Sequence, residues 1–321
     1  MFNLVEKRRW FFLFSAMLIV PGILAMIYST MTTKDHSPFR LSIDFVGGSV
    51  YEVKFTAAGA TESGIREVFA AYGEGGNLTI QRIGDVAEYR WSIRGDFHED
   101  TQAILNDLAD LAPLDRDYGY TETVSATVGR EVARAAVIAV IVASLVITGF
   151  IVWAFRQVPK AARYGVCAVT AMIHDVFVVM GFASIMGLLR GWEIDALFLT
   201  ALLTVVGYSV QDTIVMFDRI RENIPKHLGE PFETIVNRSI WETIHRSLAT
   251  QLNAVFVMIA ILLFGGETIK QFIAILCIGL LSGTYSSIFN AVPLLVAWEK
   301  GEIPFLKGDL VLASAEAEEY F

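Results

Sequence analysis

The stretch VIAVIVASLVITGFIVWAF, residues 137–155, contains no charged side chain. A bilayer core of about 30 Å requires roughly 20 apolar residues in a helix, so this stretch predicts a membrane span. Five further stretches have the length and the apolar composition of spans, near residues 10–31, 164–189, 194–217, 247–266 and 271–298. Hydrophobic residues make up 54 % of the 321-residue chain. The sequence therefore predicts a polytopic α-helical membrane protein with six spans.

The first of these stretches has two readings, a secretory signal or a retained span, because Lys7, Arg8 and Arg9 precede it. The apolar core of a signal is typically about 7–15 residues long, and residues 10–31 exceed that length. No small-residue cleavage pattern follows cleanly. We expect a retained first span.

Residues 32–131 hold almost all of the net charge, with 17 acidic and 9 basic side chains, whereas the whole chain has a net charge of −9. An acidic chain without a basic patch is unsuited to nucleic acid, whose binding depends on phosphate neutralisation. The two cysteines, Cys167 and Cys277, lie inside apolar runs, so neither a disulfide framework nor a zinc motif is expected. No G-x-x-x-x-G-K-[ST] motif for nucleotide phosphates occurs, and no cofactor is predicted.

Lysine and arginine accumulate in cytoplasmic loops, which predicts the orientation of the spans. Thirteen basic residues fall on one side, and only Arg190 and Lys270 lie in the two short loops on the other. The thirteen are Lys7, Arg8, Arg9, Arg156, Lys160, Arg163, Arg219, Arg221, Lys226, Arg238, Arg246, Lys300 and Lys307. Both termini are therefore expected in the cytoplasm and residues 32–131 outside it. The expected organisation is a first segment 1–31, an extracytoplasmic domain 32–131, a five-helix bundle 132–298 with a cytoplasmic loop 218–246, and a cytoplasmic tail 299–321.

Residues 32–131 have the pattern of a small α+β domain. We expect a bent strand over 41–55, broken at Gly47-Gly48, followed by a helix over 61–72, strands over 77–84 and 87–94, a helix over 97–111 and a strand over 118–127. This β-α-β-β-α-β order is that of a ferredoxin-like unit. With no catalytic constellation in the segment, we expect a binding or packing module. Residues 231–247 are read separately, as an amphipathic cytoplasmic helix at the membrane surface.

Charged side chains inside spans are costly and tend to face the bundle interior. His174-Asp175 lies in the third span, Asp212 in the fourth, and Arg246 opens the fifth. Helical spacing puts neighbours on shared faces: Thr204 and Tyr208 with Asp212, Thr250 and Asn253 with Arg246, and Ser282, Ser286 and Asn290 with one another. An Asp212–Arg246 pair is within reach. Such a pair would serve proton coupling or a static contact between helices, and His174-Asp175 would be a proton relay or a polar helix contact.

Four segments in order resemble the SecF family of protein-export membrane proteins, part of the resistance-nodulation-division superfamily. They are FRLSIDFVGG (39–48), His174-Asp175-Val176, VGYSVQDTIVMFDRIREN (206–223) and NRSIWETIHRSLAT (237–250). The motif residues include Asp44, Gly47, Gly48, Asp218, Arg219 and Arg221. Ser42, Gln211 and His245 depart from the usual family residues, which are Gly, Asn and an apolar residue.

The resemblance implies a transport subunit of the bacterial cytoplasmic membrane and not an enzyme. Members work with SecD beside the SecYEG translocon, with YajC as a further partner, and use the proton-motive force to promote translocation of preproteins. The fourth-span aspartate and fifth-span arginine of that family, here Asp212 and Arg246, belong to its proton pathway. The six spans are half of the twelve that the superfamily typically has, so a second half is implied.

Three other classes remain as alternatives. A half-size exporter of lipids or small molecules would share the superfamily fold. An intramembrane aspartyl protease would use Asp175 and Asp212 as its dyad, although the Gly-x-Gly-Asp pattern of that class is missing before Asp212. A purely structural assembly subunit would need no titrating residue.

Overall fold

The computed structural model describes residues 3–33, 36–73, 78–84, 86–156 and 160–303. Most of the predicted tail, including Lys307, and residue 77 at the start of a predicted strand lie outside these ranges. Within them, six helices are long and apolar enough to cross a membrane, as the sequence predicts. They are Val5–Thr32, Ala126–Ala154, Ala161–Arg190, Ala196–His227, Phe232–Phe264 and Ile269–Glu299.

The chain divides into two compact units. Residues 41–138 form the α+β unit, and residues 1–40 with 139–321 form the membrane unit. Helix α5 (Ala126–Ala154) belongs to both, because the division falls within it.

The α+β unit has the element order that the sequence predicts. Its strands are β1 (Gly48–Lys54), β2 (Thr79–Ile83), β3 (Arg90–Gly95) and β4 (Tyr120–Val124), and its main helices are α3 (Glu62–Ala71) and α4 (Thr101–Leu111). A short 3-10 turn, η2 (Val86–Glu88), precedes β3. The strands pair antiparallel in the order β2-β3-β1-β4. β1 pairs with both β3 and β4, and Tyr51 lies opposite Ile93 on one side and Thr121 on the other.

Local chemistry explains where the two helices of this unit begin. The side chain of Thr61 accepts a hydrogen bond from the Gly64 N–H, and that of Asp100 accepts one from the Ala103 N–H. These are N-caps, which satisfy backbone donors that a first helical turn leaves free. The apolar faces of both helices join the inward side chains of β1 and β3 in one buried core, which includes Tyr51, Ile65, Phe69, Trp91, Ile93, Ile104 and Leu108.

The prediction of one bent strand over 41–55 is wrong in its first half. Residues Ile43–Val46 form a single helical turn, α2, and the strand begins at Gly48. Ser42 caps this turn by accepting a hydrogen bond from the Asp44 N–H at 3.2 Å. Gly47 ends it with φ +82°, and a Cβ there would lie 2.6 Å from the Ala126 Cα. A serine cap at the start and a glycine at the end thus override the alternating pattern.

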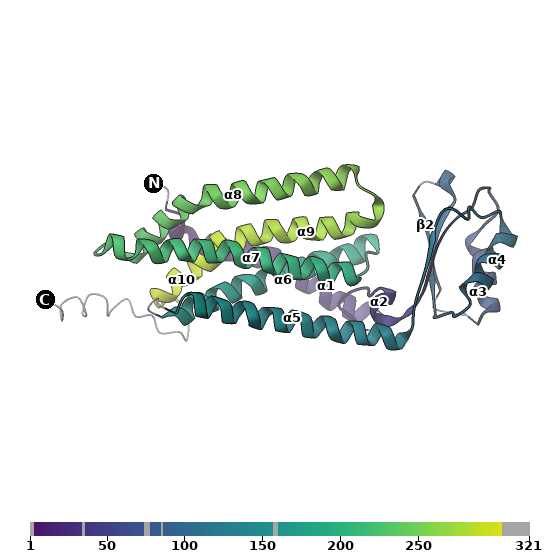
Figure 1. Ribbon diagram of the computed structural model, residues 1–321, viewed down its shortest axis with the longest axis horizontal. Helices are drawn as coiled ribbons and strands as arrows, with labels where there is room; N and C mark the ends of the chain where they lie inside the picture. Colours follow the sequence, from purple (N-terminus) through teal and green to yellow (C-terminus); the bar gives the residue numbers. More distant parts are fainter. Residues whose placement is uncertain (1–2, 34–35, 74–77, 85, 157–159, 304–321) are drawn as a thin grey trace. The chain divides into compact units, whose positions relative to one another are not determined.

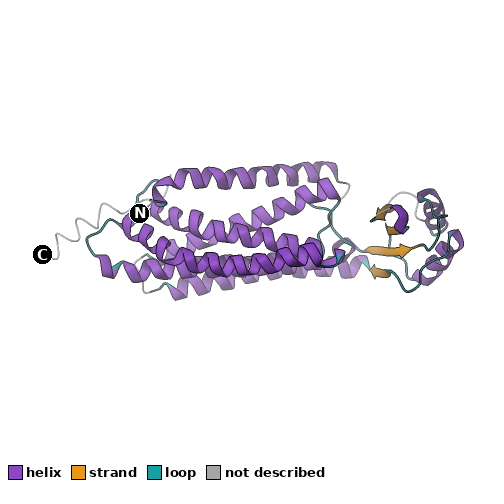
Figure 2. Cartoon of the chain, turned by 90° about the horizontal axis from the view of Figure 1, so that it is seen from above, coloured by secondary structure: helices purple, strands orange, loops and turns teal. Residues whose placement is uncertain are grey.

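The long helices of the membrane unit lie side by side along their lengths (Figures 1 and 2). They are α1 (Arg8–Thr32), preceded by the 3-10 turn η1 (Val5–Lys7), then α5, α6 (Ala161–Arg190), α7 (Ala196–Asn223), α8 (Phe232–Phe264) and α9 (Glu267–Ser286). In α6 and in α7, half of the most apolar 18-residue stretch is buried. In α5, only 6 % of the corresponding stretch is buried. Helices α6, α7 and α9 therefore form the interior, and α5 presents nearly all of its surface to the surroundings.

Small residues allow these helices to approach closely. Gly22 of α1 faces Gly181 of α6, and a Cβ on either would lie 2.6 Å from the Cα of the other. A Cβ on Gly283 of α9 would lie 3.2 Å from the Ser209 Cα of α7. Close backbone approach at small residues is a main source of association between helices in lipid.

Residues 231–247 do not form the separate surface helix that the sequence suggested. They are the first half of the continuous 33-residue helix α8, which follows the turn η3 (Pro225–His227). Val236 and Ile240 are fully buried in the core of the membrane unit together with Val5 and Phe217. The amphipathic face covers other helices instead of lipid head groups, and such a face has the same sequence pattern in both cases.

The sixth span is interrupted. α9 ends at Ser286, a π turn, η4, covers Ser287–Ala291, and α10 (Val292–Glu299) follows. Pro293 lies just after the π turn, and a proline cannot donate the backbone hydrogen bond that a regular helix requires. The wider turn accommodates this loss, and such turns are frequent at functional sites.

Candidate functional site in the membrane unit

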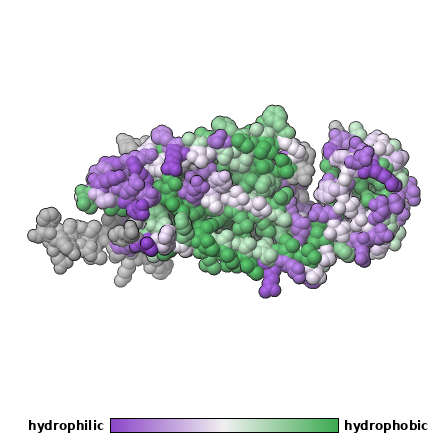
Figure 3. Space-filling view, viewed as in Figure 1, coloured by the Kyte–Doolittle hydropathy of each residue, from purple (hydrophilic) through white to green (hydrophobic). Residues whose placement is uncertain are grey.

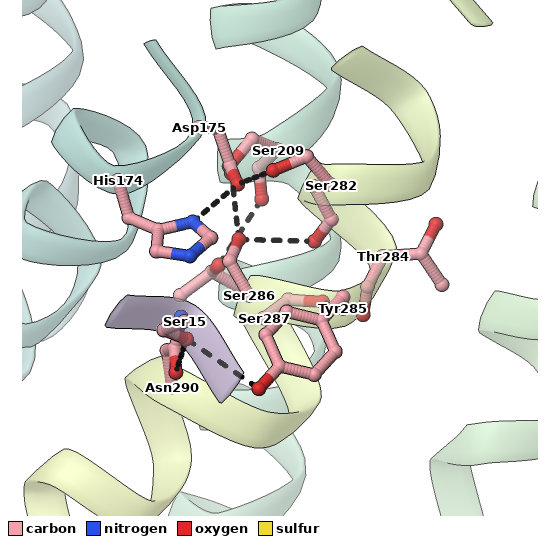
Figure 4. A network of polar contacts seen from close by, with 12 residues as sticks. Ser15, His174, Asp175, Ser209, Ser282, Thr284, Tyr285, Ser286, Ser287 and Asn290 are labelled. Carbon is pink, nitrogen blue, oxygen red and sulfur yellow. Dashed lines mark hydrogen bonds and ion pairs between the residues drawn. The ribbon is translucent and has the colours of Figure 1, made fainter. Parts of the chain in front are cut away.

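The carboxylate of Asp175 lies at the centre of a buried polar cluster between α6, α7 and α9 (Figure 4). Its Oδ2 accepts hydrogen bonds from the hydroxyls of Ser209 at 2.5 Å and Ser286 at 2.6 Å. Its Oδ1 accepts one from the Ser282 hydroxyl at 2.6 Å and lies 3.0 Å from His174 Nδ1. The Asp175 side chain is 0 % exposed.

Helical spacing explains how these donors meet one carboxylate. Ser282 and Ser286 are four residues apart on α9 and share a face, as the sequence predicts. Ser209 comes from the neighbouring helix α7 and lies beside Gly283. Three serine hydroxyls and the Nδ1 atom of His174 thus surround the two carboxylate oxygens.

His174 links this cluster to α1. The centroids of the His174 and Tyr285 rings lie 6.1 Å apart. The Tyr285 hydroxyl donates a hydrogen bond of 2.7 Å to the Phe11 carbonyl of α1. The Ser15 hydroxyl of α1 donates to Asn290 Oδ1 in the π turn at 2.8 Å. His174 Nε2 is buried and has no hydrogen-bond partner in the structure.

Asp212 of α7 forms a second site with α8. Its Oδ2 accepts a hydrogen bond from Gln251 Nε2 of α8 at 2.7 Å, and the residue is 8 % exposed. Gln251 Oε1 is buried without a partner. No ion pair joins Asp212 and Arg246 in the part of the chain that the structure describes.

The expected Asp212–Arg246 pair is thus replaced by an Asp212–Gln251 hydrogen bond. The reason is the rotation of α8: Arg246 and Gln251 are five residues apart, about 140° around the helix axis at 100° per residue. Ser247 and Gln251 are buried, whereas Arg246, Thr250 and Asn253 are exposed. The prediction that Arg246, Thr250 and Asn253 share one face of the helix is correct, but that face points outward. The sequence analysis did not select Gln251, although its spacing of four residues from Ser247 indicates a second polar face.

Thr204 and Tyr208, the residues expected on one face with Asp212 and candidates for the proton pathway, lie on an outward strip of α7. Tyr208 is 41 % exposed, Thr204 is half-buried, and Thr200, Gly207 and Gln211 are exposed. Figure 3 shows paler, more polar residues over α7 within the apolar belt of the long helices. Exposed polar groups at this depth are costly against lipid. The structure therefore separates the expected residues into two buried carboxylate sites and one exposed polar strip.

The motif residues have structural partners. Asp218 pairs with Arg221 at 2.6 Å, and Arg219 pairs with Glu222 at 2.9 Å and with Glu242 of α8 at 2.6 Å. These contacts, with the Asn223–Ser239 hydrogen bond of 3.0 Å, join the end of α7 to the start of α8. Asp44 lies in the first turn of α2, and Gly47 and Gly48 both have positive φ.

A further ionic network joins the chain's first and last described segments, and sequence reasoning missed it. Arg8 pairs with Glu233 of α8 at 3.2 Å and with Glu302, and Lys300 also pairs with Glu233. The hydrogen bond from Arg8 lowers the pKa of the Glu302 carboxyl. Among the described residues, no group of three or more His, Cys, Asp or Glu side chains comes together in a way that could hold a metal ion.

The dyad of an aspartyl protease is not assembled. The Asp175 carboxylate is bound by His174 and three serines, whereas the Asp212 carboxylate is bound by Gln251. A shared proton between two carboxyl groups requires them to be in direct contact. The geometry instead offers two separate buried carboxyl groups with different partners.

Comparison with known proteins agrees with this arrangement of spans. The family described as "Protein export membrane protein SecD/SecF, C-terminal" matches residues 104–301, and the "SecD/SecF GG Motif" matches residues 36–58. The protein translocase subunit SecF of Anaerolinea thermophila is 44 % identical over 312 residues, which are 94 % of this chain and 96 % of the relative.

Fused relatives extend the similarity. The protein translocase subunit SecDF of Bacillus subtilis is 31 % identical over 94 % of this chain, but this chain spans only 38 % of the relative's length. The crystal structure of SecDF from Thermus thermophilus, described as a translocon-associated membrane protein, superposes with a TM-score of 0.72 at 29 % identity. It covers 93 % of this chain and 39 % of the SecDF chain. The chain therefore belongs to the SecD/SecF family of protein-export membrane proteins and, within it, to the SecF translocase subunits.

Proposed function

We propose that this SecF-type subunit, together with a SecD-type partner, uses the proton-motive force to promote translocation of preproteins through the SecYEG translocon. The observation that carries the proposal is the buried Asp212 carboxylate, held inside a membrane bundle by a single amide hydrogen bond. Ionisable groups at such positions commonly belong to ion pathways. One proton that crosses 100 mV supplies about 2.3 kcal/mol.

The Asp212–Gln251 contact can serve both protonation states. When Asp212 is ionised, its oxygen accepts from Gln251 Nε2, as observed. A protonated Asp212 would instead donate, and the buried and unpartnered Gln251 Oε1 is the acceptor that a rotated amide would present. Protonation would therefore exchange the atom of the Gln251 amide that contacts Asp212, and so change the contact between α7 and α8. Arg246 would favour the return to the ionised form.

A SecD-type partner would cover the polar strip on α7. Tyr208 and Gln211 are exposed within an apolar belt, and polar groups there are stabilised by contact with another polar helix surface. The fused SecDF relatives, of which this chain spans 38 % and 39 %, support a second half of the same assembly. YajC and preprotein clients complete the proposed partners.

The proposed location is the bacterial cytoplasmic membrane, with both termini in the cytoplasm and the domain over residues 32–131 outside it. The membrane segments would then be 1–31 and 132–298, with the loop 218–246 and the tail 299–321 in the cytoplasm. A reporter fused within residues 96–117 should be active only outside the cytoplasm, and one fused within 226–230 only inside. The opposite activity at either position would contradict this topology.

The test of function is Asp212→Asn, which imitates the protonated carboxyl and keeps its volume. We expect near-normal abundance and partner binding, with loss of gradient-stimulated export from membrane vesicles down to the level without the subunit. ATP-driven initiation should persist. Arg246→Met, which keeps much of the side-chain stem, should lose the same stimulation. Asp110→Asn, at an exposed position of α4, is the matched control. Full gradient stimulation in a well-folded Asp212→Asn protein would leave only a static role for Asp212.

A further inference from the structure

His174 has one buried nitrogen that no contact explains. The residue is 7 % exposed, its Nδ1 lies 3.0 Å from Asp175 Oδ1, and its Nε2 has no partner (Figure 4). A buried polar atom without a hydrogen bond costs about 1–3 kcal/mol. Such orphaned atoms in a folded protein need an explanation, and an exchangeable ligand is one.

If Asp175 is ionised, its contact with His174 determines which ring nitrogen carries hydrogen. An ionised carboxylate can only accept, so Nδ1 must donate to it. In a neutral imidazole the other nitrogen then holds a lone pair. His174 Nε2 is therefore a buried base whose lone pair is unused.

The surroundings offer Asp175 little other counter-charge. α7 contributes Ser209, α9 contributes Ser282, Tyr285 and Ser286, the π turn contributes Asn290, and α1 contributes Ser15 and the Phe11 carbonyl. Of the groups that face His174, only Asp175 and Tyr285 titrate, and the Tyr285 hydroxyl donates to Phe11. Among the described residues, no lysine or arginine pairs with Asp175. A proton on Nε2 would make the imidazole a cation and bring the net charge of the His174–Asp175 pair from −1 to zero.

We propose that Nε2 of His174 is a second proton-binding position in the membrane unit, separate from Asp212, with Asp175 as its fixed counter-charge. The step is simple proton binding: an N–H bond forms with a proton delivered by water, and the same bond breaks on release. The serines hold Asp175 in place and ionised in both states. The conformational change that this proton would drive rests on the proposed function.

Helix α7 connects the two positions. Ser209 donates to Asp175, and Asp212, three residues later and about 60° around the helix axis, contacts α8. The Thr213 hydroxyl donates to the Ser209 carbonyl at 3.1 Å. When the charge of Asp175 is neutralised by His174, its attraction for the Ser209 and Ser286 hydroxyls weakens. The contacts of α7 with α6 and α9 would then change together with those at Asp212.

The direct test is nitrogen NMR of the full chain in lipid nanodiscs with 15N-labelled histidine. The chain contains 5 histidines, and His174→Gln identifies the signals of the buried one. At high pH we expect His174 to carry hydrogen on Nδ1 and none on Nε2. As pH falls, Nε2 should gain a proton while Nδ1 keeps its own, and Asp175→Asn should shift this titration to lower pH. His245→Gln, at an exposed position of α8, should leave these signals in place.

Two results would overturn the proposal. One is hydrogen on Nε2 at high pH, and the other is a ring that gains no second proton at any pH at which the chain stays folded. These readouts are independent of export activity, so a failed Asp212→Asn test would not produce them. For a role in the cycle, His174→Gln, whose amide can still donate to Asp175, should lose gradient stimulation as Asp212→Asn does. Full stimulation in a folded His174→Gln protein would refute that role even if His174 titrates.

Discussion

The two units of this chain place their polar groups in opposite ways. The interior of the α+β unit is apolar, built from side chains such as Tyr51, Phe69 and Leu108. The interior of the membrane unit contains Asp175 and Asp212 with their hydroxyl, imidazole and amide partners, while many large apolar side chains cover its surface. The membrane unit therefore buries carboxylates within a largely apolar interior and exposes apolar side chains, whereas the core of the α+β unit is built from apolar side chains.

This difference shows which force holds each unit together. In water, burial of apolar surface contributes about 25 cal/mol per Å², so the α+β unit is stabilised by its core. In lipid there is little such gain between helices, and association depends on close packing and hydrogen bonds. The Gly22–Gly181 contact and the Asp175 cluster supply these two terms in the membrane unit.

We expect the largest loss of stability from substitution of Asp175 in the membrane unit. Asp175→Ala leaves three serine hydroxyls and His174 Nδ1 without their shared acceptor. Each buried donor left without an acceptor costs about 1–3 kcal/mol, and several are affected here. Thermal unfolding in detergent should show this loss, with a much smaller one for Asp212→Ala, which frees one amide. Equal losses for the two variants would contradict a polar cluster that stabilises the bundle.

The second prediction tests the apolar core of the α+β unit. Leu108 is fully buried there, so Leu108→Ala should destabilise this unit by about 2–5 kcal/mol. Hydrogen exchange on the intact chain should show faster exchange across residues 41–125, and α6, α7 and α9 should keep their protection. Val128→Ala, at an exposed position of α5, serves as the control. Faster exchange throughout the bundle would mean that the two units unfold together.

The third prediction concerns the single hydrogen bond at Asp212. Gln251→Leu keeps the approximate volume but removes the donor to the Asp212 carboxylate, which should cost about 1–3 kcal/mol of stability. Asn253→Leu, two residues further along α8 and exposed, should cost less. Both can be measured by thermal unfolding. A larger loss in the Asn253 variant would indicate that the exposed face of α8 is the one that matters.

The smallest effect is expected at Glu52 of β1, where burial raises the pKa of the carboxyl. A raised folded-state pKa means that the folded α+β unit binds the proton more tightly than the unfolded chain. Stability should therefore fall as pH rises from the unfolded carboxyl's value, about 4.3, through the folded pKa. Glu52→Gln should be slightly more stable than the wild type at pH 7, by about 0.5 kcal/mol. That advantage should vanish below pH ~4, and its persistence in acid would exclude a titrating Glu52.

Much of the fold could be predicted from local patterns. The six spans follow from the length and composition of apolar stretches, and the helix that begins after Thr61 follows from its cap. The shared face of Ser282 and Ser286 follows from a spacing of four residues, and both hydroxyls do bind one carboxylate. The predictions for residues 41–47 and 231–247 failed because each sequence pattern fits two structures. The first pattern fits a strand or a capped helical turn, and the second fits a helix at the membrane surface or a buried helix.

The sequence by itself determined that a membrane protein with two carboxylates inside its spans would form, because hydrophobic length and charge cost are properties of each segment. Only the tertiary structure decided which groups meet those carboxylates. Each residue turns a helix by about 100°, so the rotation of α8 about its own axis decides that Gln251, and not Arg246, is the partner of Asp212. The donors of Asp175 likewise come from α6, α7 and α9, and their meeting depends on how close glycines such as Gly283 let these helices pack.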